Sequence, residues 1–173
     1  AIVKNDNPFV QKFSGYKQYN AMQKVLYKSN ATTQHNLNLQ YSTSSNIPRY
    51  DRLTDLKSNG DLKSARWDYG PQKRILAAYK FTKEKAIFNS DLTIGTSYQN
   101  IEESRITRDY QKASETTRTE KVAVYSINAD LKAKIGKGEL VYGMEGFYDD
   151  LKSTANKIDV TTGINSAAST RYS

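Results

Sequence analysis

The feature of this sequence that most constrains its fold is a strict alternation of apolar and polar residues. The alternation is longest between Ala123 and Ala133, where every second residue is apolar and, of the residues between them, only Val124 is apolar. Successive side chains of a strand point to opposite faces, whereas a helix repeats about every 3.6 residues, so this pattern is typical of a β-strand. The segment is therefore predicted to form a strand with one apolar face, which carries Tyr125 and Ile127.

Five further segments alternate in the same way, so the sequence predicts about six strands. They lie at Tyr16–Lys28, His35–Thr43, Arg74–Phe81, Asn89–Gln99 and Leu140–Tyr148. Each of the six spans about 8–13 residues, which is compatible with the ~9–11 residues of a tilted membrane strand. Connected in sequence order, they predict an all-β fold, an antiparallel up-and-down meander that forms a segment of a transmembrane β-barrel.

The predicted connections between these strands differ in length. Short turns are expected at residues 29–34, 82–85 and 135–139, whereas residues 44–66 and 100–120 form long connections that are expected to include strand extensions beyond the membrane. Short turns at one end and long loops at the other are the layout of an outer-membrane barrel, whose long loops are extracellular. A half-exposed sheet in a soluble protein also alternates, so a soluble or cell-surface β-rich binding or adhesion module is the alternative.

The composition supports a barrel segment and argues against several other classes of protein. No run approaches the ~18–20 apolar residues that a membrane-spanning helix needs, and the first residues lack the apolar core of a signal peptide. The chain has 13 tyrosines, and several fall near strand ends on the apolar face, where an aromatic girdle belongs. It has no cysteine and one histidine, His35, so neither thiol chemistry nor a histidine-based metal site is expected.

Neither an enzyme nor a nucleic-acid-binding protein is expected. The sequence contains no glycine-rich phosphate loop, no H-E-x-x-H motif and no G-x-S-x-G motif. The formal net charge is +8, but the cations are spread along the chain and interleaved with acids, whereas a nucleic-acid-binding face needs clustered Lys and Arg. We therefore expect no catalytic residue, no cofactor, no metal and no nucleic-acid partner.

Four runs of residues have the order and spacing of a known family of barrels. They are Asn46–Thr54, Ala65–Arg74, Tyr98–Arg105 and Tyr142–Tyr148. Through these runs the chain, from about Phe9 to Thr162, resembles the barrel region of TonB-dependent outer-membrane receptors, particularly the Bacteroidetes type.

The resemblance implies a location in the bacterial outer membrane and a role in nutrient uptake. Such receptors have about 22 strands around a plug domain, and they bind siderophore-iron, haem, cobalamin or a glycan at the extracellular side. Residues 1–173 are then expected to be a partial barrel of about six strands, without the plug domain and the remaining strands. The partners that the resemblance implies are outer-membrane lipid and lipopolysaccharide, the small nutrient ligand and, through the plug, an inner-membrane energy-coupling complex.

Candidate ligand-binding residues lie in the two long connections, at the predicted extracellular end. Loops carry binding residues more often than other elements, and arginine binds carboxylate and phosphate groups bidentately. Most residues of a loop bind nothing, so the alternative is a solvated rim that faces lipopolysaccharide. The candidates are Arg49, Tyr50, Arg52, Trp67, Tyr69, Arg105, Arg108 and Tyr110.

An open sheet of six strands leaves two strand edges and one apolar face uncovered. The edges are expected near Tyr16–Lys28 and Leu140–Lys152. An unpaired edge is a template for another chain, and the apolar face exceeds what a soluble monomer normally exposes. We therefore expect the isolated chain, without detergent or the rest of the barrel, to self-associate or to curl so that its apolar face packs inside.

Overall fold

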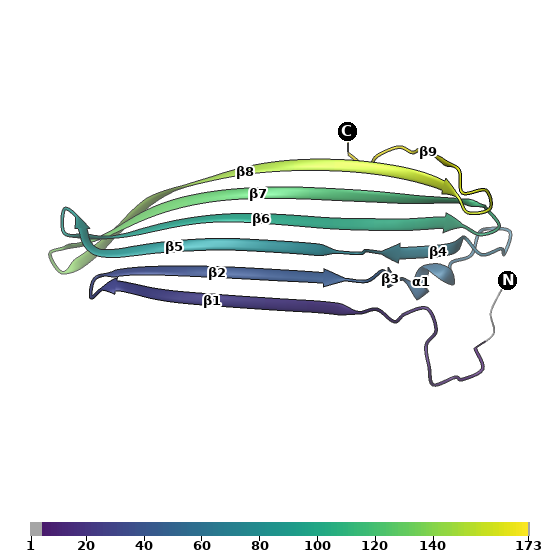
Figure 1. Ribbon diagram of the computed structural model, residues 1–173, viewed down its shortest axis with the longest axis horizontal. Coiled ribbons are helices and arrows are strands. Elements are labelled where there is room, and N and C mark those ends of the chain that lie inside the picture. The colour runs from purple at the N-terminus through teal and green to yellow at the C-terminus, as the bar shows by residue number, and fades with distance from the viewer. Residues whose placement is uncertain (1–4, 173) are drawn as a thin grey trace.

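The computed structural model describes residues 5–172 and forms one antiparallel β-sheet (Figure 1). The six long strands are β1 (Gln18–Asn30), β2 (Thr33–Ser44), β5 (Lys73–Ile87), β6 (Ser90–Asp109), β7 (Ser114–Ile135) and β8 (Gly138–Asp159). The short elements are β3 (Ile47–Pro48), α1 (Tyr50–Leu53), β4 (Ser64–Tyr69) and β9 (Asn165–Ala167). Within this part of the chain, no helix has the length and apolarity to cross a membrane.

The six long strands pair in sequence order. The order across the sheet is β1-β2-β5-β6-β7-β8, and β9 pairs with the end of β8. β1 is therefore one edge of the sheet, β8 forms most of the other, and the sheet does not close into a barrel. This arrangement confirms the predicted all-β, antiparallel, up-and-down class, and an open sheet of this kind is compatible with a segment of a barrel.

Strand pairing places the predicted apolar residues on one face. One row across the sheet consists of Val25, Leu37, Tyr79, Thr96, Ile127 and Gly146. The adjacent row consists of Lys24, Asn38, Ala78, Ser97, Ser126 and Phe147. Partners across a ladder share a face and neighbours along a strand alternate, so the first row belongs to what we call the apolar face and the second to the polar face. Leu37 and Asn38 lie on opposite faces, as predicted.

The described residues form essentially a single layer, so they enclose almost no core. Ile106 is the one buried hydrophobic residue among residues 5–172, whereas Ile127 is 60% exposed and Met144 is 76% exposed. The accessible surface is 12406 Å², but a compact protein of 19.6 kDa exposes ~8,600 Å² by the usual scaling with mass. The excess of ~3,800 Å² is sheet surface without a covering layer.

Residues 100–120, predicted as a long connection that includes strand extensions, consist almost entirely of such extensions and contain only a short turn. β6 continues to Asp109 and β7 begins at Ser114, so the chain turns only at residues 110–113. The ladder is continuous from the Glu102–Lys121 pair to the Arg108–Glu115 pair. The threonines of this segment favour strand because they are β-branched. β8 also extends beyond its predicted end, to Asp159. The segment therefore directs its side chains alternately to the two faces, which a loop does not do.

The turn predicted at residues 82–85 is also misplaced. β5 continues to Ile87, and the chain reverses at Phe88 and Asn89, whose φ angles are +47° and +57°. Positive φ at both central residues is the backbone of a type I′ hairpin turn, for which Asn, Asp and Gly are preferred. Phenylalanine is not such a residue, so this turn has a weak sequence signal.

β4 and β5 lie end to end and together form one long partner for β6 (Figure 1). β5 ends its pairing with β6 at Lys73, and β4 resumes it at Tyr69. The gap between them is bridged by Gly70, whose N–H donates to the carbonyl of Ser104 at 2.7 Å. β3 follows β2 and pairs with β4. The excursion of residues 49–63, which contains α1, is thereby held at the end of the sheet where β6 and β7 meet.

Candidate ligand-binding site

Strand register brings four of the predicted site residues to the polar face. Tyr69 lies opposite Arg105 on β6, and Trp67 is two residues before Tyr69 on β4. Arg49 follows β3, and its N–H donates to the carbonyl of Trp67 at 2.9 Å, which continues the β3–β4 ladder by one residue. Arg105 is an even number of residues from Ser97, so these four side chains lie on the polar face.

These four side chains, together with Arg52 of α1, form a stack of guanidinium groups and rings that we call the arginine–aromatic cluster. The guanidinium carbons of Arg49 and Arg105 lie 5.4 and 5.3 Å from the centre of the Trp67 ring. They lie 5.3 and 5.5 Å from the centre of the Tyr69 ring. Arg52 lies 5.9 Å from Trp67, and the two rings meet edge-on at 4.7 Å. Each cation–ring contact contributes about 0.5–1 kcal/mol at an exposed site, so the cluster holds its three cations by several weak contacts.

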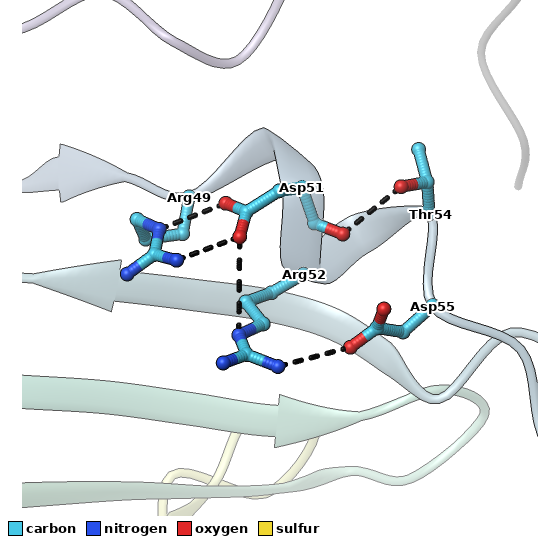
Figure 2. A network of polar contacts seen from close by, with 5 residues as sticks. All are labelled: Arg49, Asp51, Arg52, Thr54 and Asp55. Carbon is cyan, nitrogen blue, oxygen red and sulfur yellow. Dashed lines mark hydrogen bonds and ion pairs between the residues drawn. The ribbon is translucent and has the colours of Figure 1, made fainter.

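Two aspartates neutralise two of these three arginines (Figure 2). Arg49 donates from Nε and Nη2 to the two carboxylate oxygens of Asp51 at 2.8 and 2.6 Å. Arg52 donates to Asp55 at 3.3 Å and lies 3.9 Å from Asp51, while the Thr54 hydroxyl donates to the Asp51 carbonyl at 2.9 Å. The hydrogen bond from Arg49 holds the pKa of Asp51 below its ordinary value and raises the pKa of Arg49. Asp51 is therefore ionised at neutral pH, and its pair with Arg49 persists.

Arg105 differs from the other two arginines because no acid neutralises it. Among residues 5–172 its side chain has no ion pair and no hydrogen bond, and its buried Nε has no partner. It contacts the rings of Trp67 and Tyr69. Directly opposite it on β7 lies Arg118, and like charges in this position destabilise an antiparallel pair. Arg105 is thus the member of the cluster with capacity left for an anionic group.

The other three predicted residues, Tyr50, Arg108 and Tyr110, line a separate hollow and do not join the cluster. The hollow has a volume of about 480 Å³, and its walls come from the N-terminal segment, the region of α1 and β4, and the end of β6. Phe13 and Leu62 contribute apolar side chains to its lining. The structure therefore divides the eight candidates into two groups.

Arg108 belongs to an ion-pair network that ties three strands together. Arg66, opposite it on β4, donates to Asp68 and to Glu115, both at 2.8 Å. Arg108 lies 3.8 Å from the second carboxylate oxygen of Glu115. Asp68 is buried, and the Glu115 side chain is 12% exposed. Breaking a pair of this kind leaves a desolvated charge without a partner, so Arg108 and Arg66 stabilise the contact between β4, β6 and β7.

Sequence reasoning missed the residues that continue the polar face next to the cluster. Arg118 and Glu120 on β7 lie opposite Arg105 and Glu103 on β6, and Ser153 on β8 lies opposite Glu120. All five share one face because they are partners in the ladder or are two residues apart on a strand. Their signal is this even spacing, which becomes visible once the segment is recognised as paired strand.

No family model, no curated protein and no solved structure matches the chain. Among residues 5–172, no group of three or more His, Asp or Glu side chains is placed to hold a metal ion. The polar face at this end of the sheet offers guanidinium groups, carboxylates and aromatic rings, and these can bind and orient a charged ligand.

Proposed function

We propose that this chain forms part of the wall of an outer-membrane β-barrel receptor that takes up a scarce nutrient. The observation that carries the proposal is the apolar face. Two rows of strand partners bound an uncharged band on this face. One row consists of Lys73, Glu102 and Lys121, and the other contains Lys83 and Leu92. From β1 to β7 the apolar face has no charged residue between these two rows. A wide uncharged face on a single-layered sheet needs lipid or a second layer to cover it.

The height of this uncharged band matches that of a membrane barrel. The two rows that bound the band meet β7 at Lys121 and at Leu131, which are ten residue steps apart. At ~3.3 Å each they give ~33 Å along the strand, and a tilt of ~40° reduces this to ~25 Å along the membrane normal. Outer-membrane barrels have an apolar band ~25 Å tall, so the dimension supports a strand that crosses the membrane once.

Aromatic side chains gather towards both ends of the band. Tyr98, Tyr125 and Tyr148 form a row near the charged border, with neighbouring ring centres 5.0 and 6.1 Å apart. Towards the short turns, the His35 ring lies 5.8 Å from Tyr27 and 5.4 Å from Phe81. Aromatic girdles at both interfaces are a feature of membrane barrels.

The transport part of the proposal rests on the resemblance to TonB-dependent receptors. In such a barrel of about 22 strands, this chain would supply six long strands and the rest of the receptor would supply the plug. The apolar face would then contact outer-membrane lipid, and the arginine–aromatic cluster, which lies on the polar face, would line the lumen beyond the membrane at the extracellular end. The nutrient would be siderophore-iron, haem, cobalamin or a glycan, with energy from an inner-membrane complex that contacts the plug.

A spin-label scan of β7 tests the membrane location. The chain has no cysteine, so single cysteines can be introduced at each position from Ala123 to Ala133 and labelled in the protein reconstituted into lipid bilayers. We expect a label at Ile127 to collide with O₂ and to be shielded from a nickel chelate, and a label at Asn128 to show the reverse. Equal access of the nickel chelate to both faces would contradict the proposal and favour the soluble binding module.

A further inference from the structure

Buried polar atoms without a partner gather on one part of the polar face. Three of the five such atoms among residues 5–172 are Arg105 Nε, Glu120 Oε1 and Ser153 Oγ. They belong to two adjacent rows, one with Arg105 opposite Arg118 and one with Glu103, Glu120 and Ser153 side by side on three strands. Buried polar groups in proteins are nearly always paired, so these unpaired donors and acceptors set this part of the polar face apart from the rest of the sheet.

The two rows separate positive from negative charge. Arg105 faces Arg118 across the ladder, and in the next row Glu103 faces Glu120. Like charges directly opposite are unfavourable in an antiparallel pair, and within residues 5–172 no ion pair joins the arginine row to the glutamate row. Arg118 donates instead to the carbonyl of Ser169 at 3.2 Å. Each row thus holds charges of one sign, and no ion pair between the rows compensates them.

The sum of charges at this place decides which kind of ligand fits. The two arginines and the two glutamates cancel, and the nearby Arg49 is already paired with Asp51. A purely anionic ligand would satisfy the arginine row and leave the glutamates facing each other, and a purely cationic ligand would do the reverse. A zwitterion serves both rows at once, with charge-assisted hydrogen bonds at each end.

We propose that these two rows bind a zwitterionic ligand about the length of a dipeptide. Rows two residues apart on a strand are separated by ~6.6 Å, and two extended residues span ~7 Å. The carboxylate would accept from Arg105 and Arg118, and the ammonium group would donate to Glu103, Glu120 and the Ser153 hydroxyl. This inference rests on the proposed function in that the polar face is taken to line the lumen of the receptor.

Titration of the purified protein in detergent with glycylglycine, acetate and glycinamide tests the inference. Calorimetry measures binding, and Trp67, the only tryptophan of the chain, reports on the site because its ring contacts Arg105 at 5.3 Å. We expect glycylglycine to bind more tightly than either singly charged probe. Arg105→Gln and Glu120→Gln should each weaken it about tenfold or more, because each removes a charge-assisted hydrogen bond.

Matched variants elsewhere on the polar face provide the controls. Lys80→Gln and Glu145→Gln remove one positive and one negative charge on the polar face far from the two rows, and they should leave binding unchanged. Acetate that binds as tightly as glycylglycine, with no effect of Glu120→Gln, would overturn the inference. A second result would also overturn it. If Arg105→Gln and Glu120→Gln each lower the stability of the ligand-free protein, and the double variant is no less stable than either single variant, then the two side chains pair with each other and not with a ligand. The spin-label scan of β7 is independent of this binding, so failure of the membrane proposal is seen separately.

Discussion

A lysine introduced at two adjacent positions of β7 should have very different effects if the apolar face contacts lipid. Ile127 lies on the apolar face near the middle of the uncharged band, and Asn128 lies on the polar face. Ile127→Lys and Asn128→Lys therefore add the same charge at the same depth on opposite sides of the sheet. In a membrane wall, only the first variant should strongly destabilise the folded protein.

The expected size of the effect follows from the depth of the residue. A lysine on the lipid face of a barrel costs ~2–4 kcal/mol at the midplane and ~0–1 kcal/mol near the interfaces. Ile127→Lys should therefore lower the free energy of unfolding by ~2–4 kcal/mol. Asn128 lies opposite Glu145, and its amide donates to Asp130 at 2.9 Å. A lysine there meets two carboxylates, so the change should stay within ~1 kcal/mol.

Equilibrium folding into phospholipid vesicles over a series of urea concentrations measures both effects. Equal m-values in the two variants show that the same folded state is compared, and Ile127→Met controls for the lost shape of isoleucine. Ile127 is 60% exposed within the protein itself, so a water-facing position would change stability by only ~0.5 kcal/mol. An Ile127→Lys variant as stable as Asn128→Lys would refute the reasoning.

Three further predictions concern backbone packing, pH and association. Gly143→Ala should destabilise the protein by ~1–3 kcal/mol in urea unfolding, because the added Cβ would lie 2.6 Å from the Ala129 carbonyl oxygen. Gly95→Ala should cost less, because the added Cβ there meets only the side-chain amide of Asn128. Equal losses of stability in the two variants would contradict this prediction. Since Arg49 lowers the pKa of Asp51, their pair stabilises the fold above pH 3.8 and is lost as the pH falls through the lower folded-state pKa. An NMR titration of Asp51 with a midpoint at or above 3.8 would contradict that. The isolated chain in detergent-free buffer should oligomerise, and light scattering that shows a stable 19.6 kDa monomer would contradict this.

The faces of the long strands were predictable from sequence because burial of one face imposes a period of two on hydrophobicity. Tyr125 and Ile127 lie on the predicted face, and their strand pairs with the neighbours that the meander requires. The strand ends were less predictable, because residues 100–120 are polar on both sides. Hydrophobicity then has no period, although the backbone hydrogen bonds that define the strand continue. The same loss of signal explains why β8 extends to Asp159.

The candidate site was partly predictable for a related reason. Charge and aromatic content identified Arg49, Trp67, Tyr69 and Arg105, but their meeting depends on β4 lying in line with β5, which no local pattern indicates. Arg105 and Arg108 were predicted as one group. They are three residues apart on a strand, so they point to opposite faces, and grouping them as residues of one long connection concealed this separation.

Each uncovered part of the sheet lacks something that a closed barrel in a membrane supplies. From Gly138 to Ala155, β8 is unpaired on one side and has no proline and no bulge, although soluble proteins use such devices to blunt an exposed edge. In a meander of six strands, the first and last strands run in opposite directions. Further strands can therefore be added at either edge of the sheet with the up-and-down order unbroken. This suits barrels built from an even number of strands. A neighbouring strand would pair with the β8 edge, lipid would cover the apolar face, and a ligand in the lumen would meet the charged rows of the polar face.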